Sequence, residues 1–175
     1  HAGVETEVSL ALDVMVPFGA VSAILQDFQQ AFPLVDLRLH VEALGAVAAL
    51  LLHSRADLAV AGPVLLDLPE LERKEIGSVE LVPVAAPGHP LSQLAEIRPG
   101  QARNYLQLVL TDRSTYTEGQ DFSVVSPRSW RLADLGAKRA LLIGGSGWGN
   151  MPRHLVADDI AEDRLRILDL PEGTS

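Results

Sequence analysis

Hydrophobic and polar positions alternate between strand-like and helix-like periods in the first part of the chain. Val8–Leu12 is a short apolar run that predicts a strand, and Val16–Ala31 then places its apolar residues on one helical face. Val35–Glu42 alternates strictly between apolar and polar residues, which predicts a strand with one wet face, near a sheet edge or at an interface. Strand, helix and strand within about thirty residues make a βαβ unit, so we expect a parallel sheet.

The same order of elements continues after this unit. Ala46–His53 predicts a helix, and Asp57–Ala61 predicts a compact buried strand. Gly62-Pro63 breaks that strand at its carboxyl end, which is where open α/β sheets bind ligands. The first sheet therefore offers a candidate binding edge.

A second unit begins with Val79–Ala86, a long apolar segment that predicts a strand. The elements expected after it are a short helix at Ile97–Asn104, strands at Leu106–Leu110, Ser129–Leu132 and Arg164–Leu170, helices at Ala133–Ile143 and Pro152–Ile160, and a polar loop at Tyr116–Pro127. Two α/β units joined by one long strand predict two lobes with a cleft between them. The loops at the carboxyl ends of both sheets can then face one crevice, a recurrent place for small ligands.

The most distinctive segment is the glycine-rich run Gly144–Pro152, which lies between two predicted helices. Glycines this dense let backbone N–H groups come close to a small ligand. Trp148 would supply a flat apolar wall, and Pro152 would start the next helix. The alternative is a helix C-cap followed by a turn, and the spacing alone does not separate the two.

The composition narrows the function classes. With 175 residues, of which 47% are hydrophobic, the chain can form one or two compact units. Its net charge of −9 argues against direct binding to nucleic-acid phosphates, since duplex-binding domains are usually basic. The chain has no cysteine, which excludes disulfides and thiolate metal sites and is compatible with a reducing cytoplasm. No apolar run has the length that a membrane span needs, and no signal peptide is visible.

The motifs of common enzyme classes are missing from the sequence. Ser146 has Gly144 before it, but Trp148 stands where a nucleophile elbow needs its second glycine. Gly145-Ser146-Gly147 lacks the last glycine of a dinucleotide fingerprint, and no G-x-x-x-x-G-K-[ST] loop occurs. The histidines show no paired metal-ligand spacing. We therefore expect no catalytic residue, no metal and no cofactor. An enzyme whose site residues are scattered along the sequence stays open as the least favoured of three hypotheses, and the other two are given below.

Five segments in a fixed order carry a resemblance to a known family. They are Leu25-(x2)-Phe28-(x3)-Phe32-Pro33-(x)-Val35-(x)-Leu37, Asp57-Leu58-Ala59-Val60, Val82-Pro83-Val84-(x4)-His89-Pro90-Leu91, Trp130, and the glycine run through Met151-Pro152. The combination resembles the effector-binding domain of LysR-type transcriptional regulators. The resemblance implies an α/β fold of two Rossmann-like lobes joined by crossover strands, similar to the type 2 periplasmic binding proteins. It implies lobe I at residues 1–82, lobe II at 83–165 and the start of a return crossover at 166–175.

The function that this resemblance implies is small-molecule sensing in a cytoplasmic bacterial transcription factor. An unknown effector in the interlobe cleft would change the arrangement of lobes or subunits and so control DNA binding. The DNA-binding helix-turn-helix domain, and the rest of the return crossover, are expected outside this chain. The resemblance implies a homodimer that uses Val16–Ala31 and Val35–Glu42, and it leaves open a tetramer in the full-length protein. The rival hypothesis is a periplasmic solute-binding protein of a transporter, which shares the fold.

The resemblance also implies an effector site at the ends of the strands and in the glycine run. Its residues would be Asp13, Val14, Met15, Leu44, Gly45, Ala46, Gly62, Pro63, Asp112, Arg113, Ser114, Ser146, Gly147 and Trp148. Many family members have a hydroxyl residue where Met15 and Ala46 stand, and that hydroxyl holds an effector carboxylate. Its loss here argues against a simple organic acid as the ligand.

Several of these residues have alternative structural roles. Arg113 is the best anion contact in the set, but an arginine in a loop is as readily a solvated side chain. Trp148 is better explained as a buried packing residue, and Asp13 as a cap of the helix that starts near Pro17. Asp112 and Ser114 could equally fix their own turn. His89 lies in a turn and is expected to be structural.

Overall fold

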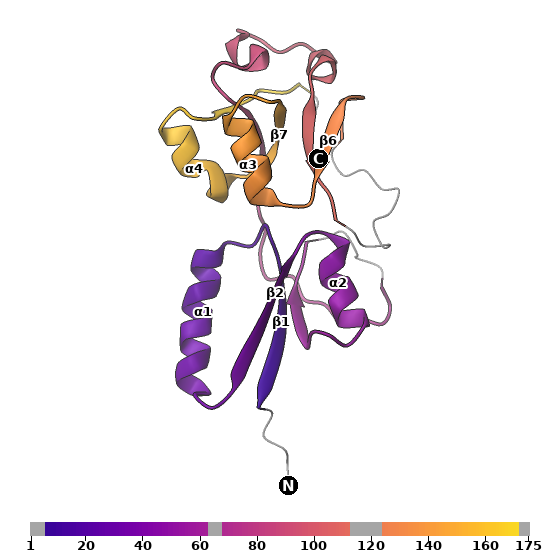
Figure 1. Cartoon of the computed structure of the whole chain (residues 1–175), viewed down its shortest axis with the longest axis vertical. Coiled ribbons are helices and arrows are strands. Elements are labelled where there is room, and N and C mark those ends of the chain that lie inside the picture. Colours follow the sequence, from indigo (N-terminus) through magenta and orange to yellow (C-terminus); the bar gives the residue numbers. More distant parts are fainter. Residues whose placement is uncertain (1–5, 63–67, 113–123, 172–175) are drawn as a thin grey trace. The chain divides into compact units, whose positions relative to one another are not determined.

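The computed structural model describes residues 6–62, 68–112 and 124–171. The chain divides into two compact units, each built around its own sheet (Figure 1). The first unit comprises residues 1–77 and 112–118, and the second comprises residues 78–111 and 119–175. No helix in the described ranges combines the length and the apolar character that a membrane crossing requires.

The first unit has a three-stranded parallel sheet with the order β2-β1-β3. Its strands are β1 (Glu7–Asp13), β2 (Asp36–Glu42) and β3 (Leu58–Val60). The helices α1 (Phe18–Ala31) and α2 (Gly45–Leu52) lie on opposite sides of this sheet (Figure 1). The predicted βαβ unit is therefore confirmed, because strands that run in the same direction need a crossover helix between them.

The two helices of the first unit are buried to different degrees. Val47 of α2 packs with Ala11 and Ala56 in a small core. By contrast, α1 has no buried residue, although its sequence is largely apolar. The prediction that Asp57–Ala61 is a buried strand is wrong in its burial, since Leu58 in β3 is 64% exposed.

The second unit has a five-stranded mixed sheet with the order β6-β5-β7-β4-β8. Its strands are β4 (Leu81–Ala85), β5 (Gln107–Leu110), β6 (Ser129–Leu132), β7 (Trp148–Pro152) and β8 (Arg166–Ile167). β5 runs parallel to β6 and β7, whereas β4 is antiparallel to β7 and β8. Two short 3-10 helices, Pro90–Gln93 and Gln101–Asn104, connect β4 to β5. The predicted helix at Ile97–Asn104 is thus reduced to one 3-10 turn, and the predicted strand at Arg164–Leu170 to two residues.

Helices α3 (Leu135–Ile143) and α4 (Arg153–Ala161) lie side by side in the second unit (Figure 1). Asp159 of α4 is buried, and its carboxylate accepts two hydrogen bonds from Arg139 of α3, at 2.6 and 2.7 Å, and one from Arg164, at 2.8 Å. These bonds lower the pKa of Asp159. Because the carboxylate joins both helices and the following turn, it fixes their packing.

The glycine-rich run is partly a strand, so the prediction of a loop between two helices is wrong there. Its second half forms β7, which lies between β5 and β4. A Cβ atom on Gly147 would lie 2.5 Å from the carbonyl oxygen of Leu106, and one on Gly149 would lie 2.6 Å from that of Leu108. The two glycines therefore let the backbone of β7 approach its neighbour closely.

The first half of the run ends α3, as the C-cap alternative predicts. Gly144 is the C-cap residue, and Gly145 has a φ of 82°, in the left-handed region that favours glycine. Pro152 is the N-cap residue of α4, which agrees with its predicted place at a helix start. The predicted polar loop at 116–127 lies mostly outside the described residues.

Candidate functional site

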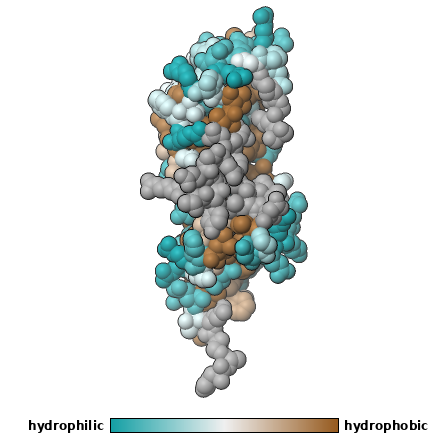
Figure 2. All heavy atoms as spheres, turned by 90° about the vertical axis from the view of Figure 1, so that its right-hand side faces the viewer, coloured by the Kyte–Doolittle hydropathy of each residue, from teal (hydrophilic) through white to brown (hydrophobic). Residues whose placement is uncertain are grey.

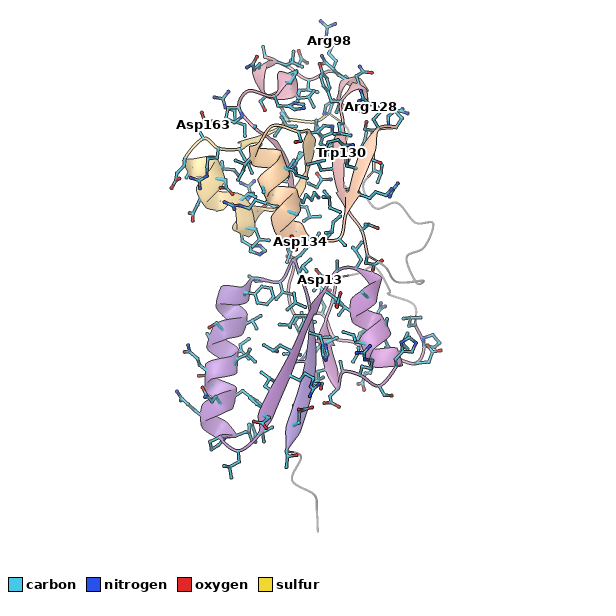
Figure 3. The ribbon with its side chains drawn as sticks, viewed as in Figure 1. Asp13, Arg98, Arg128, Trp130, Asp134 and Asp163 are labelled. Atoms are coloured by element: carbon cyan, nitrogen blue, oxygen red, sulfur yellow. The ribbon has the colours of Figure 1, made fainter. Side chains whose placement is uncertain are left out.

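Asp13 lies at the carboxyl end of β1 and is the most constrained of the candidate residues (Figure 3). Its side chain is buried, with 6% exposed. The carboxylate accepts the N–H of Met15 at 2.8 Å, and the backbone amides of Leu44 and Gly62 also hydrogen-bond to it. It therefore joins the ends of β1, β2 and β3 around one acidic group.

Burial raises the pKa of the Asp13 carboxyl, and the nearby charge of Asp112 raises it further. The hydrogen bonds from the amides of Met15, Leu44 and Gly62 oppose this change, because they stabilise the ionised form. A buried carboxyl with a perturbed pKa at a strand end is typical of functional sites. The predicted alternative role for Asp13, a cap of α1, is wrong, since the N-cap residue of α1 is Pro17 and no side chain caps the helix.

A second carboxylate in the same region belongs to Asp112, two residues after the end of β5. Asp112 Oδ2 accepts the backbone N–H of Ala46 at 3.0 Å, in the first turn of α2. The N-cap residue of α2, Leu44, offers no side-chain acceptor. Asp112 therefore supplies, from 66 residues away, the acceptor that a local cap usually provides.

Leu44 has a strained backbone at this site. Its φ is 51° and its ψ is −127°, a conformation that is normally restricted to glycine. Such a conformation costs roughly 1–3 kcal/mol and persists where the surroundings enforce it. The hydrogen bond from its N–H to Asp13 is one such constraint. Strain, a buried carboxyl and a capped helix start thus coincide at the carboxyl ends of β1 and β2.

The structure brings together most of the first-unit candidates. Hydrogen bonds join Asp13 to Met15, Leu44 and Gly62, and Asp112 to Ala46, and the two carboxyl groups are close enough for their charges to interact. We call these six residues the β1-end cluster. Val14 follows Asp13 and donates its N–H to the carbonyl of Glu42, and Gly45 is the buried first residue of α2. Pro63, Arg113 and Ser114 lie outside the described residues.

The second-unit candidates have structural partners. Trp148 is 1% exposed, and its indole N–H donates to the carbonyl of Ala102 at 3.2 Å. The structure thus gives Trp148 the packing role that the sequence favours. The N–H of Ser146 donates to the carbonyl of Leu141, and Gly147 lies against Leu106. An effector contact by these three residues stays a prediction. His89 is structural, as predicted: its Nδ1 accepts the N–H of Leu91 at 3.1 Å.

Sequence reasoning missed Lys138, a buried lysine of α3. Its side chain is 3% exposed, and Nζ donates to the backbone carbonyl of Asn150 at 2.6 Å. Burial lowers the pKa of Lys138 to about 8. The helical period carried the signal, because Leu135, Lys138 and Leu142 follow one another at three and four residues and all three are buried.

Comparison with known proteins identifies the family. The model described as the LysR substrate binding domain matches residues 1–175. The chain belongs to this family. Domains of the LysR family bind effectors for transcriptional regulators and are not enzymes. This LysR domain is 28% identical over 186 residues to the probable HTH-type transcriptional regulator YhaJ of Escherichia coli K12. The match covers 99% of this chain and 58% of that relative, so the chain spans little more than half the relative's length.

Solved LysR regulatory domains share the fold of this one. The effector-binding domain of QuiR in complex with shikimate superimposes with a TM-score of 0.76 at 19% identity, covering 98% of this chain and 84% of that one. The regulatory domain of CcmR from Synechocystis PCC6803, in complex with 2-PG, gives a TM-score of 0.66 at 19% identity, with coverages of 95% and 81%. CrgA from Neisseria meningitidis gives 0.69 at 18% identity, with coverages of 98% and 58%. The predicted α/β fold with a periplasmic-binding-protein-like architecture is therefore confirmed.

Proposed function

We propose that this LysR domain binds a small-molecule effector at the β1-end cluster and thereby regulates a DNA-binding domain of the full-length protein. The observation that supports this most is the coincidence of the buried Asp13 carboxyl, the strained Leu44 and the capped start of α2 at the carboxyl ends of parallel strands. Open α/β sheets place ligands at such ends. The QuiR and CcmR structures contain shikimate and 2-PG, which supports a small organic molecule as the kind of ligand.

The regulator is favoured over a transporter component. Both share the fold, so the fold alone does not separate them. The E. coli relative is named as a transcriptional regulator, and the part of it outside the match leaves room for a DNA-binding domain. A DNA-binding regulator of this kind works in the bacterial cytoplasm, which is where we place the full-length protein.

A screen of metabolites by thermal unfolding tests the effector function. A ligand that binds only the folded domain stabilises it by about 2.7 kcal/mol at a concentration of one hundred times Kd, so a true effector raises the Tm clearly. Asp112→Asn keeps an acceptor oxygen for the Ala46 N–H but removes the carboxylate charge from the β1-end cluster. We expect it to weaken binding by roughly tenfold or more, in line with the 1.5–3 kcal/mol of hydrogen bonds to charged groups.

The control for this screen is Asp169→Asn, which makes the same chemical change at an exposed residue of the second unit. It is expected to bind like the unchanged domain. If no metabolite class raises the Tm, or if both variants bind the effector equally well, the β1-end cluster is not the effector site.

We further propose that the protein is a homodimer through α1 and β2. The apolar residues of these two elements are unusually exposed: Ile24 is 65% exposed, Leu39 44% and Val41 46%. Between α1 and Leu39 lies an open hollow of about 370 Å³, lined by Phe18, Val21, Ser22, Leu25, Gln26, Gln29 and Leu39. Figure 2 shows a different side of this unit, where hydrophilic residues flank an apolar area. Exposed apolar surface of this extent is typical of protein–protein contacts.

A further inference from the structure

Leu44 differs from the other residues that have a positive φ without being glycine. Within the described ranges these are Leu44, Ser54 and Asp163. Ser54 and Asp163 each lie two positions after the last residue of a helix, where a left-handed residue is a common ending. Leu44 instead precedes a helix as the N-cap residue of α2, a position where the backbone is normally extended. The adjoining helix therefore does not explain its conformation.

The residue that accepts such a backbone most easily lies one position later. Gly45 is the first residue of α2, and the described glycines with a positive φ are Gly100 and Gly145. Leu44 thus has a conformation that favours glycine, whereas Gly45 has a helical one that is open to other residues. The conformational freedom of glycine at position 45 is not used in the present state.

A half-turn of the peptide plane between Leu44 and Gly45 exchanges these roles. Because the peptide unit is planar, this rotation changes the ψ of Leu44 and the φ of Gly45 by equal and opposite amounts. The ψ of Leu44 goes from −127° to about 53°, which together with its φ of 51° falls in the left-handed region open to L-residues. Gly45 then has a positive φ, which glycine accepts without strain. The flipped peptide is therefore a second allowed conformation, in which Leu44 is less strained.

Two carboxylates hold the amides on either side of this peptide. Asp13, at the end of β1 (Figure 3), accepts the N–H of Leu44, and Asp112 Oδ2 accepts the N–H of Ala46 at 3.0 Å. All four residues belong to the first unit. The Leu44 carbonyl, which a flip turns away, accepts the N–H of Val47 at 3.4 Å, longer than is usual for such bonds. The present state therefore depends more on the two carboxylates than on the bond that a flip breaks.

We propose that the Leu44–Gly45 peptide is the conformational switch of the β1-end cluster. Its strained state is held by Asp13 and Asp112, and its flipped state has a left-handed Leu44 and a positive φ at Gly45. A ligand that bonds to either carboxylate, or replaces it at the amides, competes with these bonds and so shifts the peptide toward the flipped state. The flip alters the first turn of α2. This inference rests on the proposed function and names the backbone element that responds to the effector.

Relaxation-dispersion NMR of the ¹⁵N-labelled domain without any ligand tests the switch. The flipped conformation should be a minor state, on the order of 1%, since alternative conformations a few kcal/mol apart have such populations. Exchange on the microsecond-to-millisecond timescale should then appear at the amides of Leu44, Gly45 and Ala46. The amides of β7 in the second unit are the internal control and should show none.

Substitution of Gly45 separates the switch from general mobility. Gly45→Ala should abolish the exchange, because alanine resists the positive φ of the flipped state. Gly19→Ala is the matched control: it lies in the first turn of α1, and nothing lies within 4 Å of the new Cβ. It should leave the exchange unchanged.

Substitution of Leu44 tests the strain itself and does not depend on whether the Gly45→Ala domain folds. Leu44→Gly should lower the population of the flipped state by about 5-fold or more, the factor that corresponds to the lower end of such strain. Leu44→Ala removes the same side-chain contacts but keeps the Cβ and therefore the strain. Its exchange should persist.

The inference is overturned if the amides of Leu44, Gly45 and Ala46 show no exchange, or if exchange survives in Gly45→Ala. Equal exchange in Leu44→Gly and Leu44→Ala would also overturn it. A metabolite that raises the Tm of a domain without this exchange would leave the proposed function standing. Exchange at these amides in a domain that responds to no metabolite would contradict the proposed function alone.

Discussion

The buried ionisable groups Asp159, Asp13 and Lys138 have different kinds of hydrogen-bond partners. Asp159 has two arginine partners, Asp13 is held by backbone amides, and Lys138 has a single carbonyl acceptor. The first arrangement stabilises the charged form, and its pKa moves accordingly. In the other two, burial outweighs the hydrogen bonds, and the pKa moves toward the neutral form. Of these two groups, Asp13 lies at the carboxyl end of a strand, a position where ligands bind, whereas Lys138 lies one turn into α3.

Lys138 should make stability depend on alkaline pH. Its pKa is lower in the folded domain, about 8, than its ordinary value of 10.5, so between these values the unfolded chain binds more protons. Stability from this group is therefore absent below about pH 8 and grows as the pH rises toward 10.5, by at most on the order of 3 kcal/mol. Lys138→Met should lack this rise and be the more stable protein at pH 7.

Chemical denaturation between pH 7 and 10 measures this difference, and Lys74→Met provides the matched control at an exposed lysine. Equal pH profiles for the unchanged domain and Lys138→Met would show that Lys138 is not buried as a charge.

Individual residues also explain why only part of the candidate site could be predicted from the sequence. Asp13 is predictable as a site residue because it ends an apolar strand. The bond from Ala46 to Asp112 is not, since it joins positions 66 residues apart and depends on the tertiary fold. Lys138 was predictable as inward-facing from its helical spacing, but not the absence of a carboxylate partner among the described residues.

At the scale of elements, close backbone approach decides the structure of the glycine run. A glycine-rich sequence is compatible with a loop and with a tightly packed strand. Which of the two forms depends on whether a neighbouring strand lies close to it. The carbonyls of Leu106 and Leu108 lie so near that they leave no space for a Cβ at Gly147, just before β7, or at Gly149, within it. The strands with strict alternation, such as β2, were predictable because their own period specifies them. β7, by contrast, is specified by its contacts with residues elsewhere in the chain.

Gly147→Ala should therefore destabilise the second unit. The new Cβ would overlap the Leu106 carbonyl oxygen at 2.5 Å, and since both atoms belong to or adjoin the backbone, the strands must separate. Overpacking of this kind costs typically 1–3 kcal/mol. Thermal unfolding measures the effect against Gly88→Ala, where nothing lies within 4 Å. A Gly147→Ala domain with the Tm of Gly88→Ala would contradict the close approach of Gly147 to the Leu106 carbonyl.

At the scale of the whole molecule, the first unit leaves α1 uncovered. A helix gains most of its stability by packing an apolar face, yet α1 has no buried residue. Its apolar residues and those of β2 form a surface that a second copy of the domain would cover in the proposed homodimer. The alternation of β2 predicted an edge or an interface from sequence, and the observed edge position agrees with the first of these.

Ile24→Lys should weaken the homodimer, because it places a charge in the middle of the exposed apolar surface of α1. Sedimentation equilibrium should then give a dimer for the unchanged domain and a mass near that of one chain for the variant. Ile76→Lys makes the same change at a residue that is 74% exposed and outside α1, and it should remain dimeric. A monomeric unchanged domain, or a dimeric Ile24→Lys, would refute this interface.

Backbone amide NMR during titration with an effector tests the central claim most directly. The claim is that the carboxyl ends of the first unit's strands receive the effector. The amides of Met15, Leu44, Ala46 and Gly62 should then shift together, with a single Kd, since all of them bond to Asp13 or Asp112. Saturable binding that leaves these four amides unchanged would contradict it.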